Sequence, residues 1–266
     1  MKAGTNPMNT NTNKLLAGAR PLFDNRGMRV GGNVYQAAGD QYFYSAHAQG
    51  GATATVTNII GASAAAPAPS EPENRLLFLA ANPLDTPRLR LDQEARAMDE
   101  ALRRGRLADR WRLDQHWAVR SSDLLDALQR RRPAIVHFAG HGDEDGHLIL
   151  ENEAGRAARL TPDAVAGLLA APASVRCVVL NACWSDALAE TLLGVTACVV
   201  GMAAEVQDAL ASAFAAGFYR ALADGESVTA AVAAGRAHAA AGHPGTALAV
   251  QLRAAAGVDP AAMRFD

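Results

Sequence analysis

The chain has 266 residues, 50% of them hydrophobic, which is enough for one sizeable core with an appendage but not for two full domains. Lys and Arg total 25 against 27 Asp and Glu, so the charge balance provides no general attraction to nucleic acid or to an anionic membrane surface. No stretch approaches the ~18–20 apolar residues that cross a bilayer, and the Asn- and Thr-rich beginning lacks the apolar segment of a signal peptide. We therefore expect a cytoplasmic protein without nucleic-acid or membrane partners.

The chain contains three cysteines, Cys177, Cys183 and Cys198. This odd number, without a C-x-x-C pair, argues against a disulfide framework and against a structural zinc site. We therefore expect no metal and no cofactor. Cys177 and Cys198 fall inside apolar runs and are interpreted as core residues, so Cys183 is the candidate for chemistry.

Residues 1–70 differ in composition from the rest of the chain. They are rich in Gly, Asn, Thr and Ala and end in a linker-like run of small residues and proline at 61–70. Within them, residues 33–44 and 50–60 combine β-prone side chains with amides. We predict a low-complexity, β-prone segment at 1–70 and a folded domain at 71–266.

From residue 74 onward, apolar runs alternate with helical patterns. Continuous apolar runs typical of strands buried on both faces occupy 75–80, 134–139, 175–180 and 197–201, with further strands at 111–119 and 147–151. Helices are expected at about 91–104, after 121, after 161, from 183 to 193, and at 206–223 and 228–241, where they close the domain. The alternation predicts an α/β fold with a mainly parallel sheet flanked by helices.

Two motifs follow neighbouring apolar runs at what the fold predicts to be one edge of the sheet. His141 lies in the glycine-rich loop expected at 140–146, and Cys183 begins the turn from a strand into a helix. A thiol attacks a carbonyl as the thiolate, which a helix amino terminus and a nearby base favour. His141 is therefore the candidate base, Cys183 the candidate nucleophile, and the N–H of Gly142 is open to a substrate carbonyl.

Other interpretations compete with this one. A single cysteine or histidine at a strand end is usually structural, and only the pair at one edge favours catalysis. His137 lies within its strand and is expected to pack or to orient a loop. Zinc bound by His137, His141 and His147 with a cysteine is disfavoured because a strand and its exit do not converge ligands as a helix does. The acidic run 143–145 suits a solvated turn better than a calcium site.

Residues 137–142, HFAGHG, followed by 180–185, LNACWS, resemble the paired motifs of the CHAT family, a branch of the caspase, separase and metacaspase clan. The resemblance covers about 72–245 and implies a caspase-like three-layer sandwich. It also implies a His/Cys dyad with His141 as base, Cys183 as nucleophile and Gly142 in the oxyanion hole. Weaker similarity is found at 77–83, 118–120, 123–125, Pro133 and 214–219.

One position departs from related metacaspases, which carry an acidic residue two places before the cysteine to select basic side chains. Here that position holds Asn181, a candidate substrate-binding residue. No residue inherits the acidic role by motif. The candidates for it are Asp143, Glu144, Asp145 and Asp186.

Residues 32–41 resemble the short amyloid-signalling motifs of bacterial effectors linked to NLR-like proteins. Such motifs recruit by stacking like on like, which makes 32–60 a candidate region for an NLR-like or self-stacking partner. A flexible tail is the alternative. The resemblances together imply a cysteine endopeptidase that cleaves a protein partner in bacterial defence or cell death. The rival is a catalytically silent CHAT-fold interaction module.

Overall fold

The computed structural model describes residues 74–182, 186–202, 206–246 and 248–266, all within the unit Pro67–Asp266. The amino-terminal segment 1–70, with the candidate stacking region 32–60, lies outside the described residues. The boundary between 70 and 71 therefore stays a prediction. No helix in the described part of the chain is long and apolar enough to cross a membrane.

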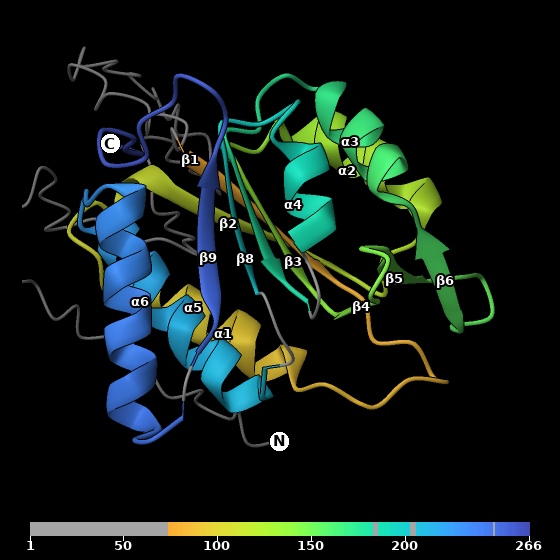
Figure 1. The fold of residues 1–266 in the computed structure, drawn as a ribbon, viewed down its shortest axis with the longest axis horizontal. Coiled ribbons are helices and arrows are strands. Elements are labelled where there is room, and N and C mark those ends of the chain that lie inside the picture. The colour runs from red at the N-terminus through yellow and green to blue at the C-terminus, as the bar shows by residue number, and fades with distance from the viewer. Residues whose placement is uncertain (1–73, 183–185, 203–205, 247) are drawn as a thin grey trace, which may run out of the picture. The chain divides into compact units, whose positions relative to one another are not determined.

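A six-stranded, mainly parallel sheet forms the centre of this unit (Figure 1). Its strands are β1 (Asn74–Ala80), β2 (Trp111–Trp117), β3 (Ile135–Ala139), β7 (Cys177–Asn181), β8 (Cys198–Met202) and β9 (Val250–Ala254). Their order is β2-β1-β3-β7-β8-β9, and every neighbouring pair is parallel except β8 with β9. The predicted α/β class is thus confirmed.

Helices cover both faces of the sheet, because alternate strand residues point to opposite faces and both sets are apolar. In β1, Leu76 and Phe78 join the core beneath α1, α5 and α6, whereas Leu77 and Leu79 join the core beneath α2, α3 and α4 (Figure 1). The result is the expected three-layer sandwich. The helices are α1 (Leu91–Arg103), α2 (Ser121–Arg131), α3 (Pro162–Ala170), α4 (Asp186–Leu192), α5 (Asp208–Ala223) and α6 (Val228–Gly242), with a 3₁₀ turn at Ala108–Arg110.

A small antiparallel sheet follows β3 in the chain. It consists of β4 (His141–Gly142), β5 (Leu148–Glu151) and β6 (Ala157–Leu160), in that order. The sequence predicted β5, but it assigned β4 to a loop and missed β6. A two-residue strand has no detectable periodicity, and no residue of β6 is buried, so neither produces an apolar run.

The prediction that two helices close the domain is wrong, because β9 follows α6 and completes the sheet. β9 lies at the edge, and Val250 is its only buried residue. It therefore lacks the continuous apolar run that marks the central strands in the sequence.

The parallel pairing of β3 with β7 brings the ends of two predicted motifs together. Ala139 lies beside Asn181 in the register, and the Gly140 amide donates to the Asn181 carbonyl at 3.4 Å. The segments that follow these strands, 140–142 and 181–182, consequently share the carboxyl edge of the sheet.

Close packing of α5 on α6 depends on glycine. A Cβ added at Gly235 would lie 2.7 Å from the ring of Phe214 and 2.9 Å from its carbonyl oxygen. We expect Gly235→Ala to lower the free energy of unfolding by about 1–3 kcal/mol, since overpacking exceeds the ~1 kcal/mol that alanine gains over glycine in a helix. Urea denaturation measures this change.

The matched control is Gly167→Ala in α3, where an added Cβ meets no atom within 4 Å. This variant should be as stable as the wild type, or more stable by up to about 1 kcal/mol. Equal stability of the two variants would contradict the close approach of α6 to α5.

Candidate active site

A pocket lies at the carboxyl ends of β3, β7 and β8, bordered by the first turns of α1 and α5. It holds about 440 Å³ of space free of atoms, part of it continuous with bulk solvent. The described residues that line it come from elements far apart in the sequence. They include Glu94, Gly140, His141, Asn181, Ala182 and Asp208.

His141 is half-buried and is held in two ways. Its backbone belongs to β4, opposite Ile149 of β5, and its Nε2 lies 2.8 Å from the carbonyl oxygen of Pro87. A carbonyl only accepts hydrogen bonds, so Nε2 carries the hydrogen of the neutral ring. Nδ1 then keeps its lone pair, which is the form required of a general base.

The loop between β1 and α1 supplies the Pro87 carbonyl and is itself fixed by Asn82. The Asn82 side chain donates to the Leu89 carbonyl at 3.0 Å and accepts from the Leu89 amide at 3.2 Å. The backbone N–H of Asn82 in turn donates to the Glu151 carboxylate of β5 at 3.0 Å. Pro87 and Asn82 were not identified as functional from the sequence, although Asn82 falls in the family-like stretch 77–83.

Gly140 allows the chain to leave β3 close to the end of β1. A Cβ at this position would lie 2.9 Å from the Ala81 carbonyl oxygen and 3.1 Å from the ring of Phe138. Any larger residue would displace the backbone that leads into His141.

A buried polar cluster lies behind the pocket. His137 is 0% exposed, with Nδ1 2.8 Å from the Tyr219 hydroxyl and Nε2 2.8 Å from Oε1 of Glu94. The side-chain amide of Asn181 donates to the same Glu94 oxygen. His137 of β3 thus packs against α1 and α5, as predicted. Glu94 was missed, because a polar residue in a helix gives no sign that it will be buried.

The zinc hypothesis fails for the described residues. Both ring nitrogens of His137 take part in hydrogen bonds, and Nε2 of His141 faces a carbonyl. In the described ranges, the one group able to converge on a metal is Asp143, Asp145 and His147, which contains neither His137 nor His141.

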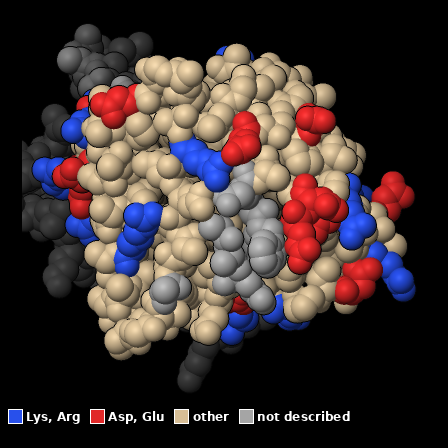
Figure 2. All heavy atoms as spheres, viewed as in Figure 1, with Lys and Arg blue, Asp and Glu red and all other residues tan. Residues whose placement is uncertain are grey.

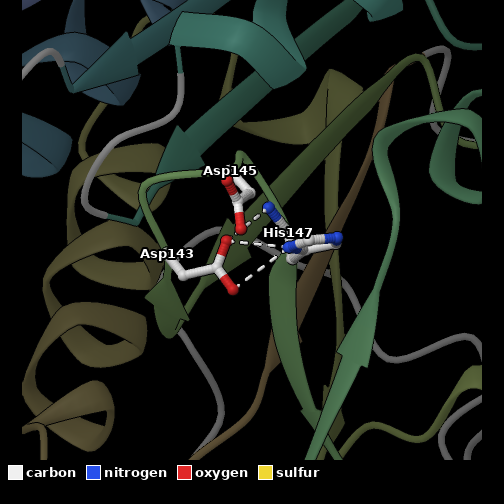
Figure 3. Close-up of side chains that lie close together, drawn as sticks. All are labelled: Asp143, Asp145 and His147. Carbon is white, nitrogen blue, oxygen red and sulfur yellow. Dashed lines mark hydrogen bonds and ion pairs between the residues drawn. The ribbon is translucent and has the colours of Figure 1, made fainter.

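That group forms a turn held by its own bonds (Figure 3). Asp143 Oδ1 lies 2.9 Å from His147 Nδ1, Asp143 Oδ2 lies 3.0 Å from Arg159 Nε, and the Gly146 amide donates to the Asp143 carbonyl. Arg159 therefore already balances the charge of Asp143, the carboxylate of this group that would otherwise attract a cation. Figure 2 shows acidic side chains gathered over the region that β4 and β5 occupy in Figure 1.

The remaining predicted residues have different positions. Gly142 lies in β4 opposite Leu148, and among the described residues Gly140, not Gly142, lines the pocket. Asp186 begins α4, and nothing is described of its side chain. Cys183 lies outside the described residues. The pocket-lining Ala182 precedes it in the sequence.

The two other cysteines are core residues, as predicted. Cys177 and Cys198 are fully buried and face each other in the register of β7 and β8. The neighbouring Cys198 thiol and burial raise the pKa of Cys177 well above its ordinary value. A thiol in this state is unreactive at neutral pH.

The CHAT domain family matches residues 33–246, which is more than half of the chain. The chain belongs to the CHAT domain family. No curated protein matches it. The match includes both motifs quoted above, and it begins within the segment 1–70.

Solved structures similar to this CHAT chain include caspase-1 from Spodoptera frugiperda, at 11% identity and a TM-score of 0.48, covering 70% of this chain and 89% of the caspase. A secreted C11 cysteine protease from Bacteroides thetaiotaomicron, solved with an irreversible peptide inhibitor, is 13% identical with a TM-score of 0.46. An inactive zymogen C11 protease from Parabacteroides distasonis is 13% identical with a TM-score of 0.45. Each C11 match covers 70% of this chain, and 62% and 63% of the respective C11 chains.

We expect a chain beginning at Glu71 to fold on its own. β1 begins at Asn74, whose side chain donates to the Phe265 carbonyl, and both helical layers pack on strands within the described ranges. Circular dichroism and urea denaturation of residues 71–266 beside the full chain test this boundary. If the shortened chain is unfolded, the family match from residue 33 marks the true start of the domain.

Asp143 should make stability depend on pH in acid. Burial opposes its ionisation, but the amide and ring of His147 and the charge of Arg159 outweigh it and lower the pKa of its carboxyl group. Asp143 therefore stabilises the fold above the unfolded pKa of about 3.9, and this contribution is lost as the pH falls through the folded pKa. Asp143→Asn should be less stable than wild type at pH 6, and the difference should shrink below about pH 4.

Urea denaturation across this pH range measures the difference. Glu144→Gln, at the exposed neighbouring position, makes the same change of charge and should differ little from wild type at any pH. A deficit of Asp143→Asn that is independent of pH would argue against an ionised, paired Asp143.

Proposed function

We propose that this CHAT domain is a cysteine endopeptidase in which His141 is the general base and Cys183 the nucleophile. The observation that carries the proposal is the hydrogen bond from His141 Nε2 to the Pro87 carbonyl. It fixes the tautomer in which Nδ1 is basic, at the rim of a pocket also lined by Ala182, the residue before Cys183. Family membership and the paired motifs support the same assignment.

The reaction follows from these groups. Nδ1 of His141 takes the proton of the Cys183 thiol, and the thiolate attacks the scissile carbonyl carbon. The N–H of Gly142 donates to the oxyanion of the tetrahedral intermediate. The intermediate expels the amine, which receives the proton from His141. Water, deprotonated by His141, then attacks the thioester, releases the acid and regenerates the thiol.

The biological role that we propose is a regulated effector of bacterial defence or cell death that cleaves a protein partner. The basis is the resemblance of both motifs and of residues 32–41. Stacking of 32–60 on an NLR-like partner or on further copies would raise the local concentration of peptidase domains. Asn181 and Asp186 are proposed to contact the substrate.

The dyad is tested with Cys183→Ala and His141→Ala. Each should abolish cleavage of a mixed peptide library, read by mass spectrometry. The fold should be retained, because His141 is outside both core clusters and Cys183 is expected at the edge of the sheet. An electrophile specific for thiols should label Cys183 in the wild type and not in His141→Ala.

Cys177→Ala is the matched control. Loss of this buried side chain should lower the free energy of unfolding by roughly 1–3 kcal/mol and leave cleavage intact. Retained cleavage in Cys183→Ala would falsify the nucleophile. A wild type that cleaves no peptide and resists the electrophile would favour the silent interaction module.

A further inference from the structure

We propose that Glu94 makes the pocket beside His141 a binding site for a basic side chain, arginine or lysine, of the substrate residue preceding the scissile bond. This inference rests on the proposed peptidase function and names the class of substrate. Neither the family motifs nor the sequence pattern points to Glu94, which becomes visible only in the folded chain.

Glu94 is 4% exposed, yet it lines the pocket. Its Oε1 is the atom that faces both His137 Nε2 and the Asn181 side-chain amide. Within the described part of the chain no residue hydrogen-bonds to Oε2. Since Oε2 is not one of the fully buried atoms without a partner, and Glu94 lines the pocket, we infer that Oε2 faces the pocket.

Within the described part of the chain, the hydrogen bonds of the cluster bring no cation to the Glu94 carboxyl group. Burial, reinforced by nearby negative charge including that of Glu94, raises the pKa of Tyr219 well above its ordinary value, so the hydroxyl keeps its proton. A buried hydroxyl needs an acceptor, and the described partner of Tyr219 is Nδ1 of His137. That nitrogen accepts, so the neutral ring carries its hydrogen on Nε2 and donates it to Glu94.

The alternative, a protonated His137, would donate from both nitrogens and leave the Tyr219 proton without an acceptor. The described neighbours of Glu94 are thus a histidine, which a tyrosine holds, and an amide, and none of them brings a cation to it. A basic side chain that entered the pocket would supply the missing cation. Its attraction to a buried carboxylate is stronger than its attraction to one at the surface.

The rim of the pocket adds a second carboxylate. Asp208 begins α5, lines the pocket and accepts a hydrogen bond from the Arg90 amide at 2.8 Å. Among the described lining residues, Arg90 is the one with a permanent positive charge, and its guanidinium is paired with Asp92 at 3.1 Å. Acidic groups therefore outweigh basic ones among the described residues around the cavity.

The walls suit the methylene stem of a long basic side chain. Apolar residues at or just before the start of α1, at the end of β8 and near the start of α5 line the pocket together with the two acidic residues. They are Leu89, Leu91, Met202, Val206 and Ala211. Lysine and arginine bury such stems against apolar surface while the charged end seeks an anion.

The test compares arginine with citrulline, which has nearly the same shape and no charge. The peptide that the wild type cleaves best is resynthesised with arginine, lysine, citrulline or norleucine before the scissile bond. We expect kcat/KM to be at least about 30-fold higher for arginine than for citrulline, as for loss of one partner of a buried charge pair. Glu94→Gln should bring that ratio to within about threefold of one by slowing arginine cleavage and sparing citrulline cleavage.

Glu100→Gln is the matched control, because it makes the same change in α1 at a residue bonded to the exposed Arg96 and not in the pocket lining. It should keep the wild-type ratio. If Glu94→Gln does not fold, Asp208→Asn takes its place with a smaller expected loss, and the wild-type ratio remains decisive alone. Equal rates for arginine and citrulline in the wild type overturn the inference and leave the peptidase proposal standing. A preference for arginine that survives in folded Glu94→Gln overturns the assignment to Glu94.

If no peptide is cleaved, a measurement of ligand binding tests the inference. N-acetyl-arginine amide and N-acetyl-citrulline amide are titrated into the full chain and into Glu94→Gln, with saturation-transfer NMR as the readout. Selective binding of the arginine compound, lost in the variant, supports Glu94 as the site for a basic side chain while the peptidase proposal fails. Binding without selectivity, or no binding, overturns the inference as well.

Discussion

The parallel pairing of β3 with β7 constrains everything at the candidate active site. With Ala139 in register with Asn181, the two motif segments must leave the sheet side by side at one edge. Polar backbone groups that leave a buried sheet need new partners. The Gly140 amide finds the Asn181 carbonyl, and the Ala81 amide finds the Ala139 carbonyl at 3.1 Å. The glycine at 140 follows from this crowding, because a side chain there would strike the end of β1.

Burial of Glu94 lowers the stability of the fold, since a carboxylate loses its hydration and gains no cation from the described residues in return. Neutral donors from β3 and β7 offset part of that cost, and Tyr219 from α5 fixes the histidine among them. A hydrophobic residue would fill the space with less penalty. The presence of an acidic residue, Glu94, in the pocket is therefore better explained by what the pocket binds than by the stability of the fold.

The sequence predicts the central strands and both flanking layers because each buried strand is a continuous apolar run. It predicts that His141 lies at the carboxyl edge of the sheet and that its segment approaches residue 181, because a parallel sheet has one functional edge. It does not predict Pro87, which acts through a carbonyl that every residue possesses. It does not predict Glu94 either, because the charge falls on a helix whose buried side is decided by tertiary packing. The exposed β6 and the half-buried β9 lack a continuous apolar run because most of their residues are not fully buried.

The small antiparallel sheet is separate from the central sheet, yet the position of His141, the proposed base, depends on it. β5 holds the backbone of His141 on one side and, through Glu151, anchors Asn82 on the other. In the turn before β6, the Gly155 carbonyl accepts a hydrogen bond from the Leu84 amide. The same sheet therefore fixes the chain at two points before Pro87. Leu89 and Arg90 at the end of that loop also line the pocket. One short loop therefore contacts both the imidazole and the pocket that we propose to receive the substrate side chain. Under that proposal the loop holds the base and the substrate in a common frame, which is the geometric condition for attack on a bound carbonyl.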